Sequence, residues 1–485
     1  MAGRRLTRTA PWLWLAVIAL AAAGCAGTSP SPSASPSLPK TTLTACTVEG
    51  VPADCGYVWV PQDWAYPAGP KMPLRVVVLP ARGTVHPAPP LFYLAGWGAP
   101  ATGFGNVSWA AQVFQTLNET SDIVFVAQRG TQDSWPETCP GLMTTGPALR
   151  AAVSRCLASV NRDPRHDTTA SAARDLDQAR KALGYDKVNL YGGSYGVSMG
   201  LAYLQAFGQH VRTAVFDSGS LLDVPLWQLS PLHTQQAFDQ MAARCAATPA
   251  CGRSYHPAAD LATVISQLQA HPARVAVAGS GTVTVTVSAF LNLVEEYLSS
   301  ADTAVLLPAD LHALARGQWE AVIRARQSDV VAAILAGNAV EAQLQEMTIR
   351  CGDAWAAMNP APMSQQAGSF PFGPMSLDVA AWQQHLCMLW PHDPGVSGVV
   401  RSSAPVLFLN GAADPADPPA NVAAAPQTMP NALLVSVPGG AHGVLATGCV
   451  LPQAIAFIQA GVPASRSAWA ACTRTIQPLP FPAAP

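Results

Sequence analysis

Residues 192–196, Gly-Gly-Ser-Tyr-Gly, constrain the fold more than any other part of this sequence. They follow a strand-like apolar stretch, 187–191, and precede a helical stretch, 197–207. A serine on a sharp strand-to-helix turn takes a strained backbone, and neighbouring glycines keep Cβ atoms out of that turn. The G-x-S-x-G spacing in this context is typical of an exposed nucleophile at the carboxyl edge of a parallel sheet. The alternative, a glycine-rich turn around a buried serine, is disfavoured by the flanking strand and helix.

Short strand-like stretches alternate with helical ones in the first half of the chain and again near its end. The strand candidates are 57–60, 74–79, 91–94, 123–127, 188–191, 212–216, 406–410 and 433–437. Between two of them, residues 170–183 have the spacing of an amphipathic helix. This alternation predicts an α/β protein with a mostly parallel central sheet covered on both faces.

The secondary-structure pattern changes between residues 221 and 396, where helical patterns dominate. The helix candidates are 234–246, 261–270, 289–299, 304–316 and 330–355, and one β-like patch, 274–287, interrupts them. We therefore predict a single sheet domain in two parts, 46–220 and 397–485, split by a helical cap at 221–396. The alternative is two independent domains in series, which fails if one active site needs both parts of the sheet.

A serine hydroxyl is a weak nucleophile, so it needs a base that is itself oriented by a carboxylate. On sheets of this kind the chain order is Ser, Asp, His, with the acid and the base on loops after later strands. Asp414 and His442 each follow one of the last two strand candidates. We predict Ser194 as nucleophile, His442 as base and Asp414 as the orienting acid. Asp417 is the rival candidate for the orienting acid. Its ordinary role would be that of a turn residue in a proline-rich loop.

Acyl transfer also needs backbone N–H groups that stabilise the developing oxyanion. One donor should be Tyr195, directly after the nucleophile, and the other should lie in the loop after the strand candidate 91–94. That loop reads Ala-Gly-Trp-Gly over 95–98, and either Gly96 or Trp97 fits the role. The alternative is a glycine turn that carries a core tryptophan.

The amino end has the features of an export signal. Three arginines precede an apolar run, 12–23, that is too short for a comfortable membrane span. The run ends in Ala-Ala-Gly-Cys, like a bacterial lipobox, so we predict a signal peptide at 1–24 and lipid attachment at Cys25. A Ser/Pro-rich tether, 25–45, would then hold the domain at the outer face of the cell membrane or cell envelope. Release of the protein from that surface is the other possibility. The alternative is an ordinary secretory peptide with a chance cysteine.

Ten cysteines remain after Cys25, an even number that favours disulfides in an exported protein. Sequential pairing is the simplest arrangement, although sequence alone does not determine connectivity. No C-x-x-C pair or His-rich spacing accompanies these cysteines, so we expect no metal and no cofactor. The formal net charge is −2 and no basic cluster lies beyond the leader, which argues against a nucleic-acid partner.

Several stretches together resemble one protein family. They are Val-Pro-Gln-Asp-Trp at 60–64, Arg-Gly-Thr at 129–131, the helix and elbow over 169–196, Cys-Gly-Asp at 351–353 and Gly-Ala-His-Gly at 440–443. The chain resembles the proline iminopeptidase and tripeptidyl aminopeptidase family of secreted actinobacterial α/β-hydrolases. The resemblance implies the α/β-hydrolase fold and a peptidase that acts on peptides outside the cell.

The sequence also departs from that family. Ala-Gly-Trp-Gly at 95–98 replaces the usual Gly-Gly-Pro-Gly, Gln132 replaces a glycine, and Asp417 replaces a threonine. These changes leave the predicted triad intact and concern substrate choice. Two alternatives stay open: a carboxylesterase with the same triad that acts on small esters, and a catalytically silent surface binding protein.

An aminopeptidase needs an anion for the free amine of its substrate. The candidates by charge alone are Glu295, Glu296, Glu341 and Glu346, all in helical patterns of the predicted cap. A solvated helix face is the ordinary role of such residues. The sequence does not choose among them.

Overall fold

The computed structural model describes residues 41–83, 88–97, 100–131, 138–139, 141–142, 144, 146–277, 281–326, 342–353 and 357–482. All of them belong to one compact unit, 38–485. The predicted signal peptide, Cys25, most of the tether, Gln132 and Glu341 lie outside the described residues. In the described ranges, no helix is long and apolar enough to cross a membrane.

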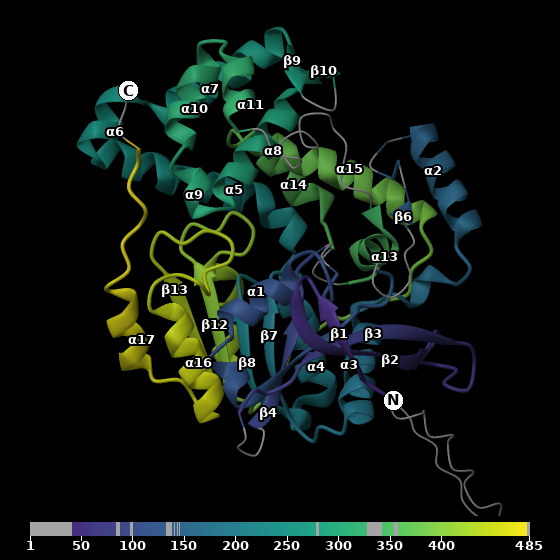
Figure 1. Ribbon diagram of the computed structural model, residues 1–485. Helices are drawn as coiled ribbons and strands as arrows, with labels where there is room; N and C mark the ends of the chain where they lie inside the picture. Colours follow the sequence, from purple (N-terminus) through teal and green to yellow (C-terminus); the bar gives the residue numbers. More distant parts are fainter. Residues whose placement is uncertain are drawn as a thin grey trace, which may run out of the picture. The chain divides into compact units, whose positions relative to one another are not determined.

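A nine-stranded sheet forms the centre of the molecule (Figure 1). Its strands, in spatial order, are β1 (Thr44–Val48), β2 (Val51–Pro61), β3 (Lys71–Leu79), β5 (Ser121–Val126), β4 (Ala88–Leu94), β7 (Val188–Gly193), β8 (Val211–Asp217), β12 (Val406–Gly411) and β13 (Ala432–Val437). The pairs among β1, β2, β3 and β5 are antiparallel, and those from β5 to β13 are parallel. The predicted α/β class, the mostly parallel sheet and all eight strand candidates are confirmed.

Successive residues of a strand point to opposite faces, and both faces of this sheet are buried. In β4, Phe92 and Leu94 join the apolar cluster that contains α3 (Thr169–Leu183) and α4 (Tyr195–Phe207). Leu91 and Tyr93 join a second apolar cluster, to which α1 (Asn106–Val113), α16 (Val450–Ala460) and α17 (Arg466–Thr473) contribute. The core therefore occupies both sides of the sheet, as parallel strands require.

Helices dominate between β8 and β12, as the sequence predicts. They are α5 (Leu226–Ala247), α6 (Pro249–Ser254), α7 (Pro257–Ala270), α8 (Val287–Leu298), α9 (Ala301–Ala304), α10 (Leu307–Ala315), α11 (Trp319–Ala325), α13 (Leu344–Gly352), α14 (Pro360–Ala367) and α15 (Pro374–Leu389). The β-like patch is a hairpin of β9 (Ala273–Val277) and β10 (Gly281–Val285). Figure 1 shows these elements gathered above the sheet. Most of the predicted helix 330–355 falls on residues that the structure does not describe, and α13 covers its last part.

One helix of this layer comes from a different part of the chain. Helix α2 (Gly146–Ser159) packs through Leu149 and Val153 into a cluster with Leu344 and Trp382 of α13 and α15. The short strands β6 (Thr138–Cys139) and β11 (Ala342–Gln343) pair nearby. The predicted cap bounds, 221–396, do not include α2, and they remain a prediction.

Five disulfides join cysteines that are neighbours in the sequence, which confirms sequential pairing. They are Cys46–Cys55, Cys139–Cys156, Cys245–Cys251, Cys351–Cys387 and Cys449–Cys472. Four of them join neighbouring elements: β1 to β2, β6 to α2, α5 to α6, and α13 to α15.

Two motif residues far apart in the sequence meet inside the fold. The guanidinium of Arg129 is fully buried and its Nε lies 2.6 Å from Oδ2 of Asp175 on α3. Arg129 also donates to the carbonyls of Pro61 and Gln62, at the end of β2. A buried charge needs such partners because an isolated one is costly. The pair fastens α3, which packs against α4, to the end of β2.

Candidate active site

Ser194 occupies the turn between β7 and α4 with φ 53° and ψ −123°, a conformation that L-residues rarely adopt. Its N–H donates to the carbonyl of Asp217 at 2.9 Å. Only the outer glycines of the motif are sterically required. A Cβ on Gly192 would lie 2.4 Å from the carbonyl oxygen of Gly196, and one on Gly196 would lie 2.2 Å from that of Leu94.

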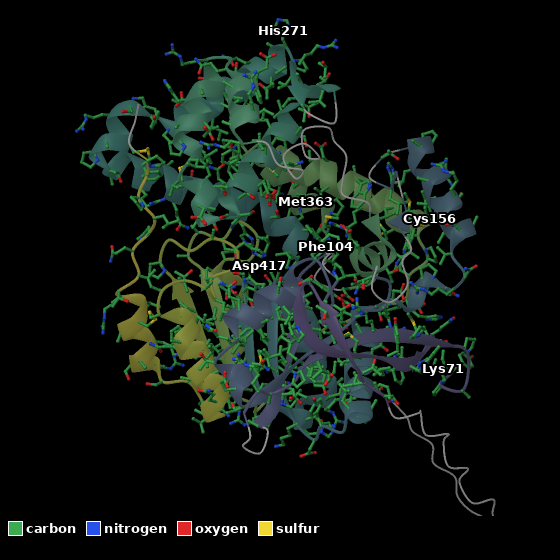
Figure 2. All side chains as sticks on the ribbon, viewed as in Figure 1. Lys71, Phe104, Cys156, His271, Met363 and Asp417 are labelled. Atoms are coloured by element: carbon green, nitrogen blue, oxygen red, sulfur yellow. A yellow bond between two sulfur atoms is a disulfide. The ribbon has the colours of Figure 1, made fainter. Side chains whose placement is uncertain are left out.

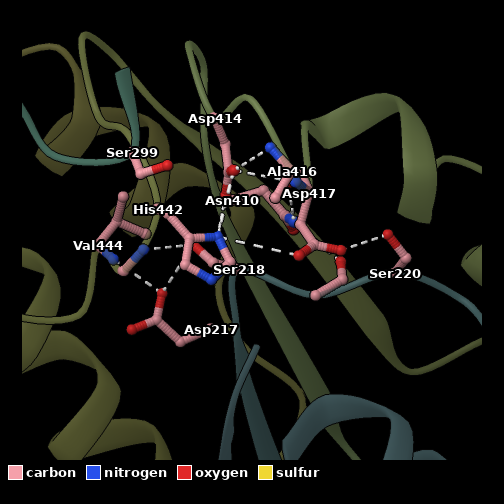
Figure 3. A network of polar contacts seen from close by, with 12 residues as sticks. Asp217, Ser218, Ser220, Ser299, Asn410, Asp414, Ala416, Asp417, His442 and Val444 are labelled. Atoms are coloured by element: carbon pink, nitrogen blue, oxygen red, sulfur yellow. Dashed lines mark hydrogen bonds and ion pairs between the residues drawn. The ribbon is translucent and has the colours of Figure 1, made fainter. Parts of the chain in front are cut away.

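His442 and Asp414 form a hydrogen-bonded pair from the loops that follow β13 and β12 (Figure 3). Nδ1 of His442 lies 3.0 Å from Oδ2 and 3.2 Å from Oδ1 of Asp414. Asp414 is buried and accepts the N–H groups of Ala416 and Asp417 at 2.9 Å each. The backbone N–H of His442 donates to the carbonyl of Ser299, which ends α8. The rival Asp417 is farther from the imidazole, with Oδ2 at 3.9 Å from Nδ1.

The charges around His442 oppose its burial. Burial is the largest single influence and lowers the pKa of His442, but the charge and hydrogen bond of Asp414 together with the charges of Asp417 and Asp217 raise it. The net pKa of His442 is therefore above its ordinary value. For Asp414, burial raises the pKa, but His442 and the backbone N–H donors lower it below its usual range. The pair favours an imidazolium beside a carboxylate.

Asp217, at the end of β8, is a site residue that the sequence reasoning missed. Its buried carboxylate accepts the N–H groups of Val444 and Leu445, two and three residues after His442, at 2.8 and 3.0 Å. Ser218, the next residue, accepts the N–H of Gly443 at 2.8 Å. The sequence did place polar residues directly after the strand candidate 212–216. Since active sites form at the edge where parallel strands end, this position could have predicted Asp217 as a site residue.

Ser194 and His442 line one cavity of about 130 Å³. Its wall is apolar on one side, with Trp97, Leu226 and Trp227. Ligand pockets of this kind usually combine an apolar wall with a few placed polar groups. Here the charged groups besides His442 are two carboxylates, Glu295 and Asp417.

The four glutamates that the sequence left open have different positions. Glu295, on α8, lies in the cavity and its Oε1 accepts Ser230 Oγ at 3.0 Å. Burial raises the pKa of Glu295 to about 7. Glu296 is exposed, and Glu346 pairs with Arg350 on the same helix at 3.2 Å. Among the described candidates, only Glu295 lines the cavity that Ser194 lines.

Trp97 is part of an aromatic wall. Its ring contacts Tyr195 and Trp227 edge-to-face, with centroids 5.5 and 6.0 Å apart. The buried guanidinium of Arg350 lies over Trp227 at 4.0 Å and over Trp97 at 5.0 Å. Cation–π contacts strengthen when water is excluded, so Arg350 braces this wall from α13.

The residues predicted for the oxyanion hole lie beside Ser194. A Cβ placed on Gly96 would be 3.4 Å from Ser194 Cβ and 4.0 Å from Oγ, so this backbone approaches the nucleophile closely. Tyr195 begins α4, where backbone N–H groups point out of the helix end. The hydroxyl of Tyr195 lies 2.9 Å from Gln128 Nε2 and 2.8 Å from Thr169 Oγ1, which fixes the start of the helix.

In the part of the chain that the structure describes, no group of three or more His, Cys, Asp or Glu side chains is arranged to hold a metal ion. The polar groups of the site are instead the serine, the histidine and the carboxylates described above.

Comparisons with known proteins agree with this geometry. Residues 89–294 match the family described as alpha/beta hydrolase fold, and residues 374–467 match the family described as TAP-like protein. The chain therefore has the α/β-hydrolase fold. The first match includes the Ser194 elbow, and the second includes Asp414 and His442.

Individual relatives match over part of their length. Serine protease Hip1 of Mycobacterium tuberculosis is 29% identical over 240 residues, which cover 42% of this chain and 44% of that protein. The tripeptidyl aminopeptidase of Streptomyces coelicolor is 31% identical over 189 residues, 34% of this chain and 35% of that protein. Carboxylesterase B of M. tuberculosis is 26% identical over 241 residues, 41% and 43%. The chain thus spans less than half the length of the curated relatives it matches.

Among solved structures, a proline iminopeptidase of Mycobacterium smegmatis is 12% identical, with a TM-score of 0.40. The similarity covers 84% of this chain and 98% of that one.

The elbow geometry predicts opposite results for two glycine substitutions. Gly196→Ala places a Cβ 2.2 Å from a backbone oxygen, so we expect a loss of about 2–4 kcal/mol in the free energy of unfolding and severely reduced hydrolysis. Gly193→Ala meets its nearest atom at 3.6 Å and should cost less than about 1 kcal/mol. Urea unfolding of both proteins measures the difference. Equal losses would contradict this description of the turn.

Proposed function

We propose that this chain is an exported serine hydrolase that cleaves peptides from their amino end through an acyl-enzyme on Ser194. The observation that carries the proposal is that Ser194, His442 and Glu295 line one cavity. The names of the relatives, a serine protease and a tripeptidyl aminopeptidase, support the peptidase class.

In the proposed cycle, His442 accepts the proton of Ser194 Oγ while Oγ bonds to the substrate carbonyl carbon. The oxyanion forms beside the backbone of Gly96 and Tyr195, with Trp97 as the other candidate donor. His442 then gives its proton to the leaving amine, and a water that His442 activates releases the acid. Asp414 keeps the imidazole oriented and stabilises the imidazolium. Each donor of such a hole is typically worth about a hundred- to a thousand-fold in rate.

Glu295 supports an aminopeptidase over other peptidases. A free amino group is cationic near neutral pH, and a half-buried carboxylate in the same cavity as the nucleophile would hold it. The distance between amine and scissile bond would then set how many residues are removed. The alternative is a carboxylesterase that acts on small esters, favoured by the similarity to carboxylesterase B and by the apolar wall. A catalytically silent binding protein is the alternative of another class.

Substituting the carboxylate separates these functions. Glu295→Gln should raise KM for free-amine peptidyl arylamides roughly ten- to a hundred-fold, because a charged hydrogen bond is worth about 1.5–3 kcal/mol. Amine-blocked arylamides and p-nitrophenyl butyrate should be hydrolysed as before. Glu296→Gln is the matched control, since Glu296 is the next residue of α8, is exposed and does not line the cavity.

The outcomes are distinct. Ester hydrolysis without amide hydrolysis would move the assignment to carboxylesterase. Equal effects of Glu295→Gln on free and blocked substrates would remove Glu295 from amine binding. No serine-dependent hydrolysis of any substrate would favour the silent binding protein.

We also propose that Cys25 carries the lipid that holds the protein at the outer face of the membrane or envelope. The support is the arginine-rich start, the apolar run that ends in Ala-Ala-Gly-Cys, and five disulfides, which persist in oxidising compartments. In a bacterial host fed radiolabelled palmitate, Cys25→Ser should abolish labelling and release the protein from the membrane fraction. Unchanged membrane retention would contradict the anchor.

A further inference from the structure

Two carboxylates face the same nitrogen of His442. Nδ1 is 3.0 Å from Oδ2 of Asp414 and 3.9 Å from Oδ2 of Asp417 (Figure 3). Asp417 is 4% exposed, and Figure 2 shows it near the junction of the sheet and the helices above it. One carboxylate is enough to orient an imidazole, so the second needs an explanation of its own.

Asp417 is held in place from several sides. Ser220 Oγ donates to its Oδ1 at 2.5 Å, and Asn421 Nδ2 donates to that hydroxyl at 2.8 Å. Asn410, at the end of β12, donates to the carbonyl of Asp417 at 2.8 Å. The N–H of Asp417 donates to Oδ1 of Asp414. With Oδ1 bound to Ser220, Oδ2 remains directed at the imidazole.

Among the residues that the structure describes, the other charged groups that act on His442 or line its cavity are carboxylates. Asp414 and Asp417 come from the loop after β12, Asp217 from the end of β8 and Glu295 from α8. His233 of α5 faces the same loop near Ala416, and burial lowers its pKa, which favours the neutral form. Like charges buried together destabilise one another, and burial and Asp414 raise the pKa of Asp417 to about 7. A positive charge among them offsets that repulsion.

We propose that Asp417 is a second positioning residue for His442, and that its carboxylate stabilises the imidazolium formed when Ser194 loses its proton. The inference rests on the proposed function. In this step the Oγ–H bond breaks as Oγ bonds to the carbonyl carbon, and the proton moves to His442. The positive charge then lies between two fixed carboxylates.

The negative charge of Asp417 also acts in the resting enzyme. It favours protonated His442 before substrate reacts, so the free base appears only at higher pH. Activity should therefore rise with pH through the raised pKa of His442. Removing the charge of Asp417 should lower the pKa of His442 and extend activity to lower pH. It should also reduce the stabilisation of the imidazolium in the transition state.

The test compares two variants that remove the carboxylate. Asp417→Asn keeps an oxygen that can accept from Ser220, and Asp417→Thr replaces the carboxylate with a side chain of different shape. In both, the acid limb of kcat/KM should move down by about one pH unit. The plateau of kcat should fall by up to about tenfold, the equivalent of one pKa unit. Asp223→Asn is the control, because this exposed carboxylate follows Ser220 in the same loop.

A second measurement does not depend on turnover. In Ser194→Ala protein with isotope-labelled histidines, NMR titration should give a lower pKa for His442 after Asp417→Asn, with His442→Gln used to assign the signal. An unchanged imidazole pKa and an unchanged acid limb would overturn the proposal and leave Asp417 a structural residue of its loop. If the wild-type protein hydrolyses nothing, the proposed function falls, and the titration still decides what Asp417 does to His442.

Discussion

The arrangement of the site depends on Asp217, at the end of β8. Its backbone carbonyl accepts the N–H of Ser194, which holds the strained turn. Its carboxylate accepts the N–H groups of Val444 and Leu445, two and three residues after His442. One residue on a central parallel strand therefore positions both Ser194 and the segment after His442, and these two residues lie 248 positions apart in the sequence. Since both bonds start from a rigid strand, the geometry is built before any substrate arrives.

Around that frame, the site gathers negative charge. Asp414, Asp417 and Asp217 come from the sheet loops, and Glu295 comes from the helices above the sheet. Such clustering destabilises the unliganded protein, and it is useful where a positive charge must form or bind. Two cations fit the proposed reaction: the imidazolium of His442 and the free amine of a peptide.

The sequence predicted what strong local patterns encode. Apolar runs predicted the main strands, and the order of loops predicted Asp414 and His442, whose side chains lie in hydrogen-bond contact. The elbow motif predicted the turn that carries Ser194. Edge strand β1 was missed because its short sequence is half exposed and carries little apolar pattern. Helix α5 begins eight residues earlier than predicted and contains Pro231. Asp217 and the choice of Glu295 depend on contacts between distant segments, which local patterns do not contain.

The most direct measurement is mass-spectrometric peptide mapping after a fluorophosphonate probe, which reacts only with an activated serine. We expect one adduct per chain, on the peptide that contains Ser194, formed much more slowly in Asp414→Asn and His442→Gln proteins. An adduct elsewhere, or none on a correctly folded protein, would contradict the claim that Ser194, Asp414 and His442 act together.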